Sequence, residues 1–165
     1  MELRGKTVLL TGASGGIGQA IALQLAAAGA RLVLVARNTA RLATLQAELV
    51  AKHPADHQIF SADLTNAQER QDLLAFVRDL QGIDLLINNA GILRDGLLLK
   101  YKDGELQSKM SLAQFQSVID VNLTGVFLCG REAAAVMVKR GTKGVIINMS
   151  SVARAGNMGQ TNYAA

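Results

Sequence analysis

The residues with the clearest chemical potential are the glycines of "TGASGGIG", residues 11–18. This stretch follows the apolar run at 7–11 and opens the alanine-rich run at 18–29, a pattern that predicts a strand, a tight turn and a helix. Glycine lets the backbone turn sharply and approach a diphosphate, whose charge is attracted by the positive end of the helix dipole. Gly12, Gly16 and Gly18 are spaced G-x-x-x-G-x-G, yet their place between strand and helix predicts a dinucleotide site. A purely structural glycine turn is the alternative.

The end of the next predicted strand carries a residue that distinguishes between the two nicotinamide coenzymes. An acidic residue there would bind the ribose hydroxyls and disfavour a 2′-phosphate, but "VARN" at 35–38 contains Ala36 and Arg37 instead. A guanidinium forms strong, charge-assisted hydrogen bonds with a phosphate. Arg37 therefore favours NADP(H) over NAD(H), and an ordinary solvated arginine is the alternative.

Strand-like apolar runs alternate with helical patterns along the whole chain. The patterns predict strands at 7–11, 31–36, 57–62, 83–91 and 144–151, and helices at 18–29, 39–52, 66–80 and from Ser111 to about Lys139. The strand cores are nearly continuous in Val, Ile and Leu, as in a sheet covered by helices on both faces. We therefore expect an α/β fold with a doubly wound parallel sheet, in one domain over residues 1–165.

The stretch "LRDGLLLKYKDGELQSKM" at 93–110 interrupts this alternation. It is charged, and it is longer than the ~2–6 residues usual for connections in such folds. One interpretation is a solvated surface loop insertion. The other is a loop near the substrate, because it leaves the carboxyl end of the fourth strand, where ligands bind in such sheets.

Composition excludes several classes of protein. Half of the 165 residues are hydrophobic and 18% are charged, which is typical of a globular protein. The only cysteine, Cys129, cannot form an intramolecular disulfide and is expected in the core. No uninterrupted apolar run approaches the ~18 residues of a membrane span, so we expect a cytoplasmic protein without a membrane partner. The net charge of +4 is scattered, so we expect no nucleic-acid partner, and we predict no metal site.

Five short segments in order carry a family resemblance: "TGASGGIG" at 11–18, "ADL" at 62–64, "NNAG" at 88–91, "VNLTG" at 121–125 and "SSVARAGNMGQTNY" at 150–163. With them the sequence resembles the short-chain dehydrogenase/reductase family, whose members have a Rossmann fold and bind a nicotinamide coenzyme. The resemblance implies that Asp63 holds the adenine amino group and that residues 88–91 line the adenosine ribose and brace the sheet. The implied coenzyme-binding residues are Thr11, Gly12, Ser14, Gly16, Ile17, Gly18, Arg37, Asp63, Leu64, Asn88, Asn89, Ala90 and Gly91.

The resemblance also implies a catalytic set of Asn122, Ser151 and Tyr163. The tyrosine would protonate the oxygen of a carbonyl that receives a hydride, the serine would bind that oxygen, and the asparagine would support a proton-relay water. Counting back from Tyr163 favours Ser150, whereas counting along the strand favours Ser151. Successive strand residues face opposite sides, so only one can face the substrate, and we select Ser151.

The family's catalytic run is Tyr-x-x-x-Lys, and its lysine position lies two residues past Ala165. We therefore expect residues 1–165 to lack the family's C-terminal strands and helices and to be a poor catalyst by themselves. A non-catalytic dinucleotide-binding module is the alternative.

Among family members, "NNAGILRDGLL" and "GNMGQTNYAA" resemble most the 3-oxoacyl-[acyl-carrier-protein] reductases. This implies NADPH-dependent reduction of a β-ketoacyl thioester in fatty acid biosynthesis, by a homodimer or homotetramer. Lys139, Arg140 and Lys143 could bind the acidic acyl-carrier protein, or could form a solvated helix end that suits the helix dipole. The 93–110 insertion leaves sugars, steroids, alcohols and acetoacetyl-CoA open as substrates.

Overall fold

A computed structural model describes residues 2–165 and contains a five-stranded parallel sheet with the strand order β3-β2-β1-β4-β7. The strands are β1 (Thr7–Thr11), β2 (Arg31–Ala36), β3 (Gln58–Ser61), β4 (Leu85–Asn88) and β7 (Val145–Asn148). The chain winds from β1 toward β3 and then returns to continue from β4 on the other side of β1. The predicted doubly wound sheet is confirmed, and its winding reverses between β1 and β4, where such folds bind ligands.

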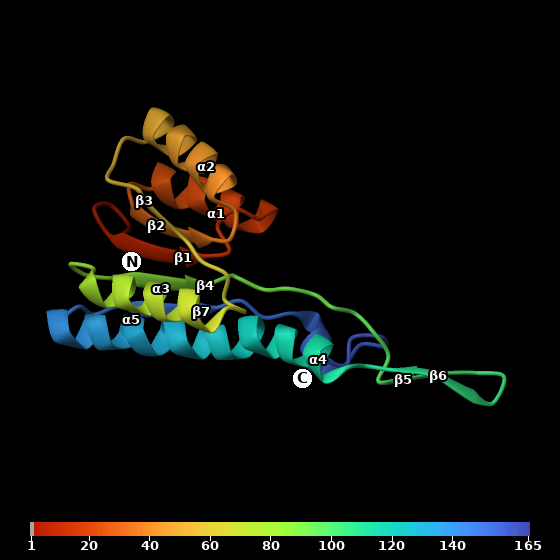
Figure 1. The fold of residues 1–165 in the computed structure, drawn as a ribbon. Coiled ribbons are helices and arrows are strands. Elements are labelled where there is room, and N and C mark those ends of the chain that lie inside the picture. Colours follow the sequence, from red (N-terminus) through yellow and green to blue (C-terminus); the bar gives the residue numbers. More distant parts are fainter. Residues whose placement is uncertain (1) are drawn as a thin grey trace.

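Helices cover both faces of this sheet (Figure 1). The helices α1 (Gly16–Ala27) and α2 (Thr39–Lys52) cover one face, and α3 (Ala67–Asp79) and α5 (Val126–Arg140) cover the other. Alternate strand residues enter the two cores: Leu10 lies in the core with α1 and α2, and Leu9 lies in the core with α3 and α5. Burial on both faces explains why β1, β2 and β4 are apolar at successive positions, whereas the residues of the edge strand β7 are exposed.

Local side chains set where several helices begin. The Asn38 side chain accepts a hydrogen bond from the backbone N–H of Arg41 (2.9 Å), which caps α2. Asn66 caps α3 in the same way, as its sequence position predicted. The helix α1 begins at Gly16, two residues earlier than predicted, and Gly29 after its end has a φ of +85°.

The long helix predicted from Ser111 is interrupted in the structure. It consists of α4 (Leu112–Ile119), a π-helical segment (Asp120–Gly125) and α5. This 29-residue stretch is long enough to cross a membrane, and an 18-residue window within it has a mean hydropathy of 1.3, which a search for uninterrupted apolar runs missed. However, α5 packs on α3 and β4 as one layer of the fold, and this packing buries apolar residues such as Ala133, Val136 and Met137, whereas others on the stretch remain exposed.

The inserted stretch 93–110 is not the irregular loop that the sequence suggested. It contains β5 (Leu99–Lys102) and β6 (Glu105–Lys109), which pair antiparallel in a hairpin that projects beyond the sheet (Figure 1). Asp103 and Gly104 at its tip have φ values of +54° and +80°, the left-handed conformation that tight hairpin turns require. Alternation of apolar and charged residues in "LKYK", followed by Asp-Gly, was the sequence signal for this hairpin.

We expect the hairpin to contribute little to the stability of the domain. All residues of β5 and β6 are exposed, and an isolated two-stranded hairpin is marginally stable. Replacing residues 99–109 with a short glycine-serine linker should change the free energy of unfolding by no more than about 0.5 kcal/mol in urea denaturation. The buried control Leu9→Ala should lose about 2–5 kcal/mol. A comparable loss on hairpin replacement would show that the hairpin belongs to the core.

Candidate active site

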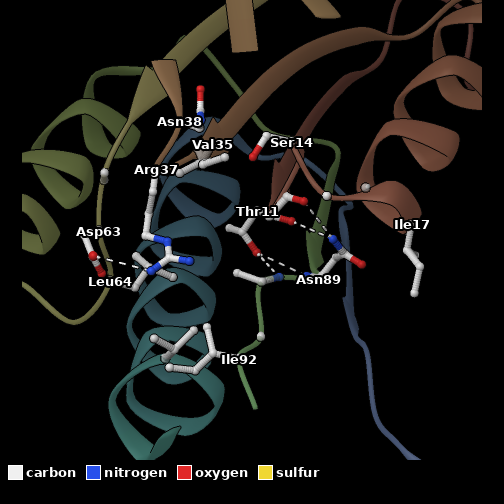
Figure 2. A pocket seen from close by; sticks show the side chains of 18 of the residues that line it. Thr11, Ser14, Ile17, Val35, Arg37, Asn38, Asp63, Leu64, Asn89 and Ile92 are labelled. Atoms are coloured by element: carbon white, nitrogen blue, oxygen red, sulfur yellow. Dashed lines mark hydrogen bonds and ion pairs between the residues drawn. The ribbon is translucent and has the colours of Figure 1, made fainter. Parts of the chain in front are cut away.

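A cavity of about 760 Å³ lies at the carboxyl edge of the sheet, beside the reversal between β1 and β4 (Figure 2). Four short segments at the carboxyl ends of β1, β2, β3 and β4 form most of its lining, and Val121 of the π-helical segment adds to it. They contain every predicted coenzyme residue except Asn88, namely Thr11, Gly12, Ser14, Gly16, Ile17, Gly18, Arg37, Asp63, Leu64, Asn89, Ala90 and Gly91. The structure therefore brings together residues that are up to 80 positions apart in the chain.

Two of the glycines are required by the fold itself. Gly12 has a φ of +69°, and a Cβ there would lie 2.8 Å from the Cα of Ala90. A Cβ at Gly18 would lie 2.9 Å from the Cα of Ala13. Any side chain at either position would push apart the turn and the segment that it contacts.

Gly16 is different, because a Cβ there would meet nothing within 4 Å. The protein leaves this space open at the first residue of α1, and Gly16 lines the cavity. The first turn of α1 has neither a side-chain cap nor an acidic residue. Its N–H groups can therefore bind a diphosphate, so the residues present fit a dinucleotide coenzyme.

Thr11 and Asn89 join the turn after β1 to the segment after β4 (Figure 2). Thr11 Oγ1 accepts hydrogen bonds from the backbone N–H groups of Asn89 (3.1 Å) and Ala90 (3.0 Å). The Asn89 Nδ2 donates to the carbonyl oxygens of Thr11 (3.1 Å) and Gly12 (3.2 Å). These four bonds fix the width of the cavity floor.

Asn88 does not line the cavity, in contrast to the expectation that it would contact the coenzyme. Its Nδ2 donates to the Oδ1 of Asn148 (2.9 Å), which links β4 to β7, and the residue is buried. Side chains alternate along a strand, so Asn88 points into the sheet layer while Asn89 reaches the cavity. Of the two roles expected for Asn88, the geometry supports the bracing of the sheet and not the contact with the coenzyme.

The other end of the cavity carries the charged groups that could select a coenzyme. Arg37 Nη1 lies 3.8 Å from Asp63 Oδ2 (Figure 2). Burial raises the pKa of Asp63, but hydrogen bonds from Thr65 and the positive charge of Arg37 outweigh it, so that the pKa is lowered overall. Asp63 is therefore ionised at neutral pH and can accept hydrogen bonds.

Arg41 also lines this end of the cavity and was missed in the sequence. It lies in the first turn of α2, four residues after Arg37, and its N–H is the one that Asn38 caps. Its spacing from Arg37, just after a helix cap, was the available signal. Arg37 and Arg41 therefore both line this end of the cavity.

A second cavity of about 430 Å³ adjoins the first, because Ile17 and residues 89–92 line both. The predicted catalytic residues Asn122, Ser151 and Tyr163 line this second cavity together. Ser150 lines it as well. One continuous crevice thus extends from the arginines to the tyrosine.

Asn122 lies in the π-helical segment and contacts the boundary between the two cavities. Its Oδ1 accepts a hydrogen bond from the N–H of Ile92 (2.9 Å), and its Nδ2 donates to the Ile92 carbonyl oxygen (3.1 Å). Both ends of the side-chain amide are therefore engaged with one backbone residue. This geometry holds the segment after β4 in place. The family resemblance implied a different role for Asn122, the support of a proton-relay water.

The two candidate serines differ in their surroundings. Ser151 is half-buried, and its Oγ accepts a hydrogen bond from the N–H of Ala153 (3.2 Å) at the start of a 3-10 turn, Val152–Ala155. Ser150 is exposed. The hydroxyl hydrogen of Ser151 remains available to bind a substrate oxygen, and the choice of Ser151 over Ser150 stays a prediction.

The basic residues proposed for carrier-protein docking lie far from this crevice. Val126, at the start of α5, lines the catalytic cavity, whereas Lys139 lies near the end of the same helix. Thirteen residues of helix separate them by about 20 Å at 1.5 Å per residue. The exposed Lys139, Arg140 and Lys143 therefore lie at the opposite end of α5, where cations suit the helix dipole.

Other reactive groups do not add to the site. Cys129 is buried in the core, and burial raises the pKa of its thiol to about 11, so it remains protonated and inert. Within residues 2–165, no cluster of three or more His, Cys, Asp or Glu side chains is placed to hold a metal ion.

Comparisons with known proteins agree with this geometry. The chain is 43% identical to nodulation protein G of Rhizobium sp. (strain N33), over 99% of the chain and 62% of that protein. It is 42% identical to a 3-oxoacyl-[acyl-carrier-protein] reductase of Synechocystis sp., over 99% of the chain and 63% of that protein. The chain thus spans less than two thirds of the length of these relatives.

Solved structures match at similar coverage. A short-chain dehydrogenase from Sphingobium yanoikuyae in complex with NADPH superposes with a TM-score of 0.83 at 32% identity, over 96% of this chain and 58% of that one. The bulky-bulky ketone specific alcohol dehydrogenase from Comamonas testosteroni gives a TM-score of 0.84 at 29% identity, over 99% of this chain and 61% of that one. The family model for short chain dehydrogenases matches residues 6–165. The chain therefore belongs to the short-chain dehydrogenase family of oxidoreductases.

Proposed function

We propose that the protein is an NADP(H)-dependent reductase that converts the carbonyl of a 3-oxoacyl thioester, bound to acyl-carrier protein, into a hydroxyl. The single observation that carries the reductase proposal is the continuous crevice. One end has Arg37 and Arg41, and the other end has Ser151 and Tyr163. A relative at 42% identity named 3-oxoacyl-[acyl-carrier-protein] reductase supports the choice of substrate.

When bound, the coenzyme would supply the hydride that adds to the carbonyl carbon. The chain's own residues then handle the oxygen. As the C=O electron pair moves onto this oxygen, the Tyr163 hydroxyl would give it a proton, and the Ser151 hydroxyl would donate a hydrogen bond. Asn122 would keep Ile92, at the junction of the two cavities, in place.

The preference for NADPH over NADH tests directly whether Arg37 and Arg41 bind the coenzyme. The variant Arg37→Ala should weaken NADPH binding by about 1.5–3 kcal/mol, roughly 10- to 150-fold, because a hydrogen bond between charged groups is lost. NADH binding should change little, and adding Arg41→Ala should weaken NADPH binding further. Titration of coenzyme fluorescence measures these affinities.

Arg31→Ala is the matched control, because Arg31 lies at the opposite end of β2 from the cavity. It should leave both affinities unchanged. Equal affinity of the parent protein for NADH and NADPH would remove the argument from Arg37 and Arg41.

The substrate proposal is tested separately, with the protein produced from its complete reading frame. It should oxidise NADPH in the presence of 3-oxoacyl thioesters. Binding of NADPH without turnover of any 3-oxoacyl thioester would refute the substrate and leave the coenzyme site intact.

We also infer that the protein acts in the cytoplasm as a homo-oligomer. Large apolar side chains are exposed along α4, the π-helical segment and α5, namely Leu112, Leu123, Phe127 and Val138. Apolar surface on one long helix favours burial against a second copy. Analytical ultracentrifugation should give a mass of at least two chains.

A further inference from the structure

The segment that carries Tyr163 is hydrogen-bonded to the base of the projecting hairpin. We call residues 94–96, which lead into the hairpin, the hairpin stalk, and residues 157–163 the tyrosine segment. The bonds run from Gly96 N–H to Gly159 O (2.6 Å), from Gln160 Nε2 to Asp95 Oδ1 (3.1 Å), from Thr161 Oγ1 to Gly96 O (3.4 Å) and from Asn162 Nδ2 to Arg94 O (2.8 Å). An insertion that departs from the family pattern thus contacts the part of the chain that holds the proton donor.

Among these residues Asn162 has unusual surroundings. It is 2% exposed, and its Nδ2 also donates to the carbonyl oxygen of Gln114 in α4 (3.3 Å). One carboxamide therefore joins the hairpin stalk, α4 and the tyrosine segment. Its Oδ1 is buried and has no hydrogen-bond partner among residues 2–165.

The buried, unpartnered oxygen argues against a purely stabilising role. A buried acceptor without a donor costs free energy, which a small apolar residue at this position would avoid. The Asn162 amide fixes geometry instead of adding stability. Its two donated hydrogen bonds hold both the position and the rotation of the residue directly before Tyr163. Proton donors need such fixing, since a displacement of about 1 Å can cost a large part of the rate.

We propose that Asn162 is a positioning residue, which fixes the Tyr163 hydroxyl in the catalytic cavity by tying its segment to the hairpin stalk and to α4. Asn162 and Tyr163 line the same cavity. The expected effect of Asn162 on kcat rests on the proposed function, whereas its effect on the position of Tyr163 does not. The two are therefore tested by different measurements.

The chain contains only two tyrosines, Tyr101 on the exposed hairpin and Tyr163. In a Tyr101→Phe background, incorporated fluorotyrosine gives one fluorine NMR resonance, that of Tyr163. The variant Asn162→Ala should broaden or split this resonance, or move it toward its position in the unfolded chain. The matched control Gln160→Ala loses the side-chain bonds to Asp95 and Asn157 but keeps the bonds of Asn162 to Arg94 and Gln114, so it should leave the resonance unchanged.

A single resonance at the parent position in folded Asn162→Ala would overturn the proposal. If Asn162→Ala does not fold by circular dichroism, Asn162→Ser provides the test, because its shorter side chain has a single hydroxyl hydrogen and cannot donate to both Arg94 and Gln114. A Tyr163 resonance in Asn162→Ser identical to that of the parent would overturn the proposal equally.

The second measurement uses turnover by the protein from its complete reading frame. Asn162→Ala should lower kcat at least 10-fold, with KM for the substrate and Kd for NADPH within about 2-fold of the parent values. A raised KM at unchanged kcat would assign Asn162 to substrate binding and contradict the proposal. If the parent shows no turnover, the proposed function fails, and the NMR comparison still decides the positioning claim.

Discussion

Replacing Tyr163 with phenylalanine, in the protein produced from its complete reading frame, is expected to lower kcat for carbonyl reduction by about 10²–10⁴-fold, the range that general acid catalysis contributes. The variant loses only the hydroxyl, which is the one proton donor that we assign to the carbonyl oxygen. Tyr163 is half-buried and lines the second cavity with Ser151 and Asn122, so the ring itself should pack as before. The affinity for NADPH should not change, because Tyr163 does not line the first cavity.

Steady-state kinetics and coenzyme titration on the same preparations measure both quantities. Tyr101→Phe is the control, since it removes the same atom from an exposed position on the hairpin, and it should leave kcat unchanged. Retention of most of the activity in Tyr163→Phe would show that another group protonates the substrate.

The variant Gly16→Asp is expected to act in opposite directions on folding and on coenzyme binding. A carboxylate in the first turn of α1 interacts favourably with the helix dipole and should stabilise the fold by about 0.5 kcal/mol. The side chain has room, because nothing lies within 4 Å of an added Cβ. The same charge repels a diphosphate at this helix end, at a cost of about 2 kcal/mol, or roughly 30-fold in NADPH affinity.

Urea denaturation and calorimetric titration of NADPH report the two effects separately. Ala20→Asp adds the same charge at an exposed position one turn further along α1, outside the cavity lining, and should weaken NADPH binding far less. Gly16→Ala separates the volume of the side chain from its charge. An unchanged NADPH affinity in Gly16→Asp would place the diphosphate elsewhere.

The sequence predicted the parts of the fold that depend on local pattern. Apolar runs such as 31–36 give strands wherever they are buried on both faces, and the glycine spacing after β1 reflects local backbone geometry at Gly12 and Gly18. These features are encoded within a few residues, and the structure reproduces them either at the predicted bounds, as for 31–36, or with shifts of at most three residues at the ends.

The features that the sequence did not predict depend on contacts between distant segments. Arg41 joins the cavity only because the segment after β2 meets those after β1 and β3. The bonds of Asn122 to Ile92 and of Asn162 to Arg94 span 30 and 68 positions, so no local pattern contains them. Asn88 and Asn89 are the same residue type, but successive side chains point to opposite sides of a strand. Asn88 therefore links β4 to β7, whereas Asn89 lines the cavity.

A crystal structure of the chain with NADPH tests the central claim most directly. We expect the diphosphate within hydrogen-bonding distance of the backbone N–H groups of residues 16–18, and the 2′-phosphate between Arg37 and Arg41. The nicotinamide ring should lie beside Ile92, where the two cavities meet. A diphosphate bound away from the first turn of α1, or NADPH absent from the crevice at saturating concentration, would contradict the assignment.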